Sequence, residues 1–146
     1  SNVLDICSGT GALGIEALSR GAKFIYFIDK DPKAIDVLQK NISKLKIDNK
    51  DKTYIKIIKE DALKALQDIK IVFDVVLIDP PYNSNVIEEC LVKLKQYNLI
   101  DFNSYIFAES SKKENFNFDG FDLLDTKLYG KSKLTILKLP NSGSVK

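Results

Sequence analysis

The chain has 146 residues, of which 45% are hydrophobic and 29% charged, and its formal net charge is +2 at pH 7. This length suits one domain that buries roughly two thirds of its unfolded surface, and no apolar segment approaches the roughly 18 residues of a membrane span. Histidine is absent, which excludes a histidine general base, a Ser-His-Asp triad and a histidine-ligated zinc.

The two cysteines and the basic residues narrow the function further. Cys7 and Cys90 fit no metal-ligand spacing, so we expect reduced thiols in a cytoplasmic protein without a metal. Arg20 is the only arginine, which argues against guanidinium contacts as the main means of recognising bases or phosphates. Two lysine clusters, Lys112-Lys113 and Lys131 with Lys133, are open to two interpretations, phosphate contact or solvated surface.

Strands and helices alternate along the chain with short connections, which predicts an α/β fold on a mainly parallel sheet. The expected elements, in chain order, are strands at 2–7, 24–29, 54–59, 72–79 and 105–109, with helices at 12–20, from 31, after 61 and at 85–97 between them. Segment 110–120 is too polar to predict a helix, and 121–128 with 133–139 predict an antiparallel hairpin that turns at Tyr129-Gly130. We expect one domain at 1–140 and a flexible tail at 141–146.

A glycine-rich turn follows the first strand. Its sequence is Asp5-Ile6-Cys7-Ser8-Gly9-Thr10-Gly11, and Gly14 completes a G-x-G-x-x-G pattern. Glycines let the backbone approach a ligand closely, and the next helix presents free N–H groups at its N-terminus. The turn therefore predicts a nucleotide-type ligand held by Cys7, Ser8, Gly9, Thr10 and Gly11.

Acidic residues end the neighbouring strands. Asp29, 20 residues beyond Gly9, is placed to accept both ribose hydroxyls, with Lys30 beside it. Asp5 precedes the glycines, where it would disfavour a pyrophosphate and favour the ammonium group of a methionyl moiety. Asp61 with Ala62 follows the third strand, where the carboxylate can accept from an adenine amino group, cap the next helix, or do both at once.

The tetrapeptide Asp79-Pro80-Pro81-Tyr82 closes the apolar run Val75 to Ile78. The two prolines end the strand ladder and stiffen the turn. One interpretation is a simple strand end. The other is an active site in which the Asp79 carboxylate and the Pro80 carbonyl accept the two hydrogens of an exocyclic amino group, while Tyr82 stacks on the base.

These motifs together resemble the RsmD-type ribosomal RNA methyltransferases. The resemblance rests on Leu4-Asp5, the glycine turn, the run Glu16-Ala17-Leu18-Ser19-Arg20-Gly21-Ala22, Asp29, Phe73-Asp74, the Asp79-Pro80-Pro81-Tyr82 motif, Glu109 and Tyr129-Gly130. It implies a Rossmann-like class I methyltransferase fold with helices on both faces of a seven-stranded sheet of order 3-2-1-4-5-7-6. It also implies S-adenosylmethionine as cofactor and methylation of a guanine N2 amino group in 16S rRNA or the assembled small ribosomal subunit. Members of that family usually carry a further segment, including a basic hairpin and a helix, before the first strand. We expect a monomer that does not bind membranes.

Three other functions are compatible with the residues. The G-x-G-x-x-G pattern also suits a nicotinamide-dependent oxidoreductase. A non-catalytic domain that binds S-adenosylmethionine and RNA is the second, and an N-methyltransferase acting on DNA adenine or a protein amide is the third. Cys7 is interpreted as a packed thiol instead of a nucleophile, Glu109 as a structural acid in preference to a cleft residue, and Tyr129 as a packing residue.

Overall fold

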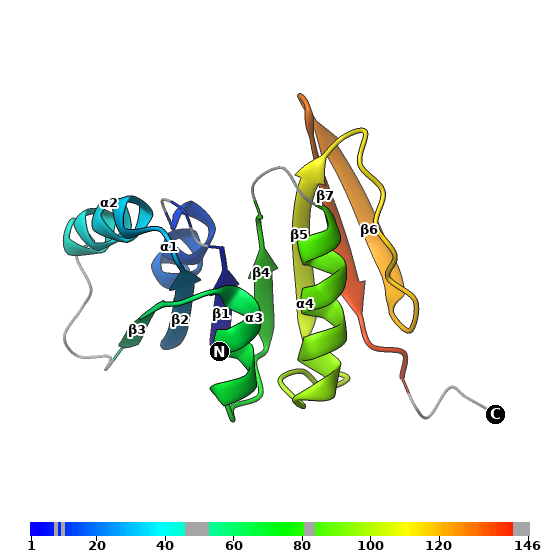
Figure 1. Ribbon diagram of the computed structural model, residues 1–146, viewed down its shortest axis with the longest axis horizontal. Coiled ribbons are helices and arrows are strands. Elements are labelled where there is room, and N and C mark those ends of the chain that lie inside the picture. The colour runs from blue at the N-terminus through cyan, green and yellow to red at the C-terminus, as the bar shows by residue number, and fades with distance from the viewer. Residues whose placement is uncertain (8, 10, 46–52, 81–83, 142–146) are drawn as a thin grey trace.

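The computed structural model describes residues 1–7, 9, 11–45, 53–80 and 84–141. The predicted alternation of strands and helices is confirmed in this part of the chain (Figure 1). Its elements are β1 (Asn2–Ile6), α1 (Ala12–Ser19), β2 (Phe24–Asp29), α2 (Pro32–Ser43), β3 (Tyr54–Lys59), α3 (Ala62–Asp68), β4 (Val75–Ile78), α4 (Ser84–Gln96), β5 (Tyr105–Ser111), β6 (Asp122–Tyr129) and β7 (Ser132–Lys138). No described helix has the length and apolar character needed to cross a bilayer.

The strands form one seven-stranded sheet of order β3-β2-β1-β4-β5-β7-β6, as predicted. The strands from β3 to β5 pair in parallel, and β7 pairs antiparallel with both β5 and β6. Because the parallel strands share one direction, the carboxyl ends of β1, β2, β3 and β4 lie along the same edge. That edge is where ligands bind in open α/β sheets.

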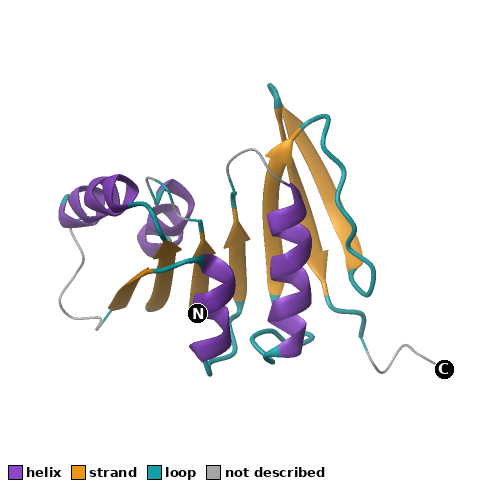
Figure 2. Cartoon of the chain, in the orientation of Figure 1, coloured by secondary structure: helices purple, strands orange, loops and turns teal. Residues whose placement is uncertain are grey.

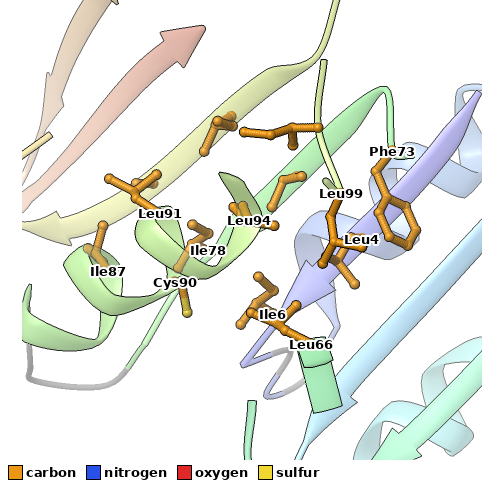
Figure 3. Close-up of a cluster of buried hydrophobic side chains, with 14 of the residues drawn as sticks. Leu4, Ile6, Leu66, Phe73, Ile78, Ile87, Cys90, Leu91, Leu94 and Leu99 are labelled. Atoms are coloured by element: carbon orange, nitrogen blue, oxygen red, sulfur yellow. The ribbon is translucent and has the colours of Figure 1, made fainter. Parts of the chain in front are cut away.

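Helices cover both faces of the sheet (Figure 2). On one face, α3 and α4 pack over β1, β4 and β5, and α4 contributes Ile87, Cys90, Leu91 and Leu94 to the larger core cluster (Figure 3). On the other face, α1 and α2 pack over Val3, Ile25 and Phe27. Each strand of the sheet centre is therefore apolar on both sides, which explains the continuous hydrophobic runs in the sequence.

Two strand boundaries differ from those predicted. The fourth strand begins at Val75, not at residue 72, because the Phe73 amide donates to the Leu99 carbonyl in a loop. The fifth strand extends to Ser111, beyond the predicted end at Glu109, because β7 pairs with it through Ser111 opposite Ser132. The antiparallel neighbour thus supplies hydrogen bonds that the polar sequence of this segment does not indicate. Strands β2 and β3 have the predicted bounds, and the other predicted elements differ by at most one residue at their ends.

Gly14 permits the close packing of α1 on the sheet. An added Cβ at this position would lie 2.7 Å from Asp5 Oδ2 and 2.9 Å from Ile25 Cδ1, and would also collide with the Phe27 ring. The glycine at this place is therefore required by the contact between the helix and the two central strands.

We predict that Gly14→Ala lowers the free energy of unfolding by about 1–3 kcal/mol, because the new methyl group overpacks a tight contact. Urea denaturation followed by circular dichroism measures the change. Ser19→Ala, on the exposed end of the same helix, is the control and should change stability by no more than about 0.5 kcal/mol. Equal stability of the Gly14→Ala protein and the wild type would contradict the packing.

Candidate active site

A cavity of about 660 Å³ opens at the carboxyl ends of the four central strands. Four carboxylates, each within two residues of a strand end, contribute to its wall: Asp5, Asp29, Asp61 and Asp79. The predicted residues Cys7, Gly9, Lys30, Ala62 and Pro80 line it as well. The volume is in the range of small-molecule and cofactor sites. Acidic residues that are far apart in sequence thus meet at one site.

Asp5 lies at the base of the cavity and is almost completely buried. Its Oδ2 atom accepts a hydrogen bond from the Gly14 amide at 3.1 Å. Burial raises the pKa of Asp5 to about 7, the Gly14 hydrogen bond opposes this rise, and the negative charges of Asp79 and Asp29 add to it. A buried acid beside other acids is stabilised by a cationic ligand, which supports the predicted role of Asp5 toward an ammonium group.

The glycine turn is closed onto Asp29. Gly9 has φ +57° and donates its amide to Asp29 Oδ2 at 2.8 Å, while Asp29 Oδ1 accepts from the Asp31 amide at 3.0 Å. Open space surrounds the position that a Gly9 side chain would occupy, so a ligand can approach the backbone there. Gly11, with φ +78°, is the N-cap of α1 and is not in the cavity wall formed by the described residues. The predicted contacts of Ser8 and Thr10 lie outside the described residues.

Asp61 caps the helix that begins at the end of β3. Its Oδ2 atom accepts from the Lys64 amide at 3.4 Å, a long hydrogen bond that leaves capacity for a further donor. Of the two interpretations of Asp61, the structure shows the helix cap, and the residue also faces the cavity.

Asp79 directly follows β4, two positions beyond Leu77, the residue that pairs with Asp5 on β1. Its amide donates to the Ile6 carbonyl at 3.3 Å, which fixes the start of the turn against β1. Burial raises the pKa of Asp79 to about 7, and the charge and hydrogen bond of Glu109 contribute to the rise. Pro80 is buried in the cavity wall. The predicted Pro81 and Tyr82 contacts lie outside the described residues.

Glu109 and Tyr129 adjoin Asp79, although neither is among the described residues that line the cavity. Ile78 pairs with Ala108, so Asp79 and Glu109 follow at neighbouring positions of β4 and β5. The Tyr129 hydroxyl donates to Glu109 Oε1 at 2.7 Å, and this bond is the main cause that raises the pKa of Tyr129 to about 12. Tyr129 is 49% exposed, and its hydroxyl contact with Glu109 lies outside the core clusters.

Cys7 is half-buried in the cavity wall and has φ +61°. Burial and the surrounding carboxylates raise its pKa to about 11, so it is a thiol at neutral pH. It also packs against the larger core cluster. These features fit a packed thiol and not a nucleophile. The described residues include no group of three or more His, Cys, Asp or Glu side chains placed to hold a metal ion.

Comparison with known proteins identifies the family. The family model described as "Conserved hypothetical protein 95" matches residues 1–138 of the chain. The chain belongs to this family. Ribosomal RNA small subunit methyltransferase D of Haemophilus influenzae is 37% identical over 112 residues, which are 77% of this chain and 58% of that protein. The chain thus spans less than two thirds of that relative.

Solved structures show the same architecture. A conserved hypothetical protein of Streptococcus pyogenes superposes with a TM-score of 0.82 at 28% identity, covering 95% of this chain and 86% of that chain. Magnesium protoporphyrin IX methyltransferase from Synechocystis, solved with bound SAM, has a TM-score of 0.67 at 16% identity, covering 95% of this chain and 70% of that one. The second likeness concerns the fold alone, and the fold is that of class I methyltransferases.

In this member of the Conserved hypothetical protein 95 family, the sequence motifs did not reveal the apolar part of the cavity wall. That part comes from helices and one strand: Leu13, Ile28, Ala34, Leu63 and Val86. Leu13 and Leu63 follow predicted site residues by two positions and could have been found from that proximity. Val86 is on α4 and reaches the site only through the packing of that helix. Its apolar character is equally compatible with the core.

We predict that Asp5→Asn stabilises the protein at pH 8 by about 1–4 kcal/mol, since each unit of pKa shift corresponds to about 1.4 kcal/mol. The folded-state pKa of about 7 lies above the ordinary value of 3.8, so wild-type stability falls as the pH rises from about 4 through 7. The neutral amide avoids that loss. Thermal melting at pH 5 and pH 8 measures it, and the difference between the two proteins should be much smaller at pH 5.

The matched control is Asp36→Asn, on the exposed surface of α2. Its effect should be small and similar at both pH values. An Asp5→Asn protein that is less stable than the wild type at pH 8 would contradict the predicted cost of burying the Asp5 carboxylate.

Proposed function

We propose that this chain is an S-adenosylmethionine-dependent N-methyltransferase that acts on the N2 amino group of a guanine in small-subunit ribosomal RNA, in the cytoplasm. The observation that carries the proposal is the position of Asp79 and Pro80 in the wall of a cavity whose other carboxylates suit a cationic nucleoside. The name of the Haemophilus influenzae relative supports the RNA acceptor.

The residues present fit this cofactor. Asp5 is a buried carboxyl with a raised pKa, and a ligand ammonium would compensate its charge. The Asp29 carboxylate faces the cavity at the end of β2, where it can accept from ribose hydroxyls, and Asp61 can accept from an adenine amino group. Leu13 and Leu63 offer apolar surface to the purine ring. Bound there, the cofactor supplies an electrophilic methyl group on a sulfonium.

The protein must activate a weak nucleophile. The lone pair of an exocyclic amino group is delocalised into the ring, and hydrogen-bond acceptors localise it. Asp79 and the Pro80 carbonyl accept the two amino hydrogens and stabilise the positive charge that develops on nitrogen. The transfer forms an N–CH₃ bond and breaks the S–CH₃ bond, whose electron pair remains on sulfur. One amino proton then leaves to Asp79 or to water.

Asp79 is suited to take that proton. Its pKa of about 7 lies close to the working pH, where a group is most effective in proton transfer. A chain without histidine can thus complete the reaction with a carboxylate. Much of the rate should come from alignment, which can contribute on the order of 7–11 kcal/mol.

Two measurements test the function directly. Calorimetric titration should give binding of S-adenosylmethionine and no binding of NAD, and Asp5→Asn should weaken it markedly. Purified small ribosomal subunits lacking the modification should accept labelled methyl groups, and mass mapping should place the label on a guanine. Binding of NAD alone would favour the oxidoreductase. Binding of S-adenosylmethionine without transfer to subunits, DNA or protein would favour a non-catalytic domain.

We predict that Asp79→Ala reduces methyl transfer by at least about 100-fold, because the amino group loses its main acceptor. Affinity for S-adenosylmethionine should stay within a few-fold of the wild type. Single-turnover transfer and calorimetry measure the two effects. Equal losses in affinity and transfer would mean that Asp79 serves the cofactor and not the amino group.

A further inference from the structure

The carboxyl pair formed by Asp79 and Glu109 extends the site beyond the amino-group acceptors. The two residues lie side by side on the parallel strands β4 and β5, one position past the pair Ile78 and Ala108. Their carboxyl groups share a side-chain hydrogen bond. The two acids are therefore close enough to interact, and Glu109 adds to the rise in the pKa of Asp79 that burial causes.

Glu109 is held in place from the terminal hairpin. The Tyr129 hydroxyl, at the end of β6, donates to its Oε1 atom at 2.7 Å. Glu109 is half-buried, and no described lysine or arginine forms an ion pair with it. Keeping an acid beside Asp79 without a cation costs free energy, and such arrangements are typical of functional sites.

The bases with an exocyclic amino group differ in the ring atom next to it. In guanine, N1 carries a hydrogen, so the N1–H and the N2 amino group form two adjacent donors. In adenine and cytosine the adjacent ring nitrogen is an acceptor. Two adjacent carboxylates therefore match guanine, and a second carboxylate would face a lone pair in the other two bases. A base that has left its stack is read along this edge.

We propose that Glu109, oriented by Tyr129, accepts the N1–H of the base whose amino group is held by Asp79 and Pro80, and thereby selects guanine. This inference rests on the proposed function and names the residue that sets its base specificity. Sites built around a hydrogen bond discriminate strongly, because the wrong ligand leaves a polar group unpaired.

The same geometry separates guanine from an amide. A glutamine side chain presents a carbonyl oxygen next to its amino group, which Glu109 would repel. The Asp79–Pro80 pair by itself reads only an amino group. Glu109 would therefore decide whether the methyl group goes to guanine or to an amide, which Asp79 and Pro80 alone do not determine.

The test compares guanine with 2-aminopurine, which keeps the amino group at C2 but has an acceptor at N1. The substrates are two RNA fragments that carry one or the other base at the nucleotide mapped in the subunit experiment. The wild type should prefer guanine by on the order of 100-fold in kcat/KM. Glu109→Gln should lower transfer to guanine by about that factor and remove or reverse the preference, because the amide can donate to N1.

Three further variants test whether the effect on base preference is specific to Glu109. Tyr129→Phe should lower the preference for guanine by several-fold, because Glu109 loses its orienting hydrogen bond. Glu89→Gln, on the exposed surface of α4, should behave as the wild type. Asp79→Ala should lose transfer to both bases. Calorimetry with S-adenosylmethionine should give wild-type affinity for Glu109→Gln, which shows that the variant is folded.

Unchanged preference for guanine in the Glu109→Gln protein would overturn the inference and leave the proposed function intact. Failure of the wild type to methylate guanine would overturn both. Loss of transfer to both bases in Glu109→Gln, with normal cofactor affinity, would also overturn the inference, because Glu109 would then act on the amino group and not on N1–H.

Discussion

The hydrogen bonds between the glycine turn and two strand-end carboxylates hold the site together. Asp5 accepts from Gly14 in α1 and Asp29 accepts from Gly9 in the turn, so the helix is held to β1 and the turn to β2. The close approach of α1 to the sheet, which only a glycine at position 14 permits, makes the first of these bonds possible. The position of the cavity follows from this contact, because α1 and the turn form one of its sides.

The cavity wall brings several carboxylates close together, which is unfavourable for the fold itself. Asp5 and Asp79 both have pKa values raised to about 7, chiefly by burial. Burial of the Asp5 carboxylate reduces the stability of the fold at neutral pH, and a cationic ligand would stabilise it. In a chain with 22 basic residues, the lack of a described ion pair to the Asp79–Glu109 pair is therefore consistent with a functional role.

The site divides into two halves along the sheet edge. The ends of β1, β2 and β3 carry the groups proposed for the cofactor, and the ends of β4 and β5 carry those proposed for the base. Asp79 is at the boundary, because its charge acts on Asp5 on one side and it neighbours Glu109 on the other. The antiparallel hairpin of β6 and β7 completes the second half by bringing Tyr129 onto Glu109.

The sequence by itself determined the order of elements, the glycine turn and the acid at the end of each central strand. These features are local, because continuous apolar runs, Asp-Pro helix starts and G-x-G spacing depend on neighbours along the chain. The family resemblance added the strand order, which periodicity could not provide.

Tertiary structure alone decided the relations across strands. The pairing of Asp79 with Glu109 depends on the register of β4 and β5, and the contact of Tyr129 with Glu109 depends on the hairpin folding back along β7. The raised pKa values likewise depend on burial by α1, α4 and the sheet, which no local pattern encodes. From the sequence, Glu109 was interpreted as a structural acid because no residue near it in the chain indicates an interaction partner. The residues that contact it lie 20 or more positions away and reach it only through the fold.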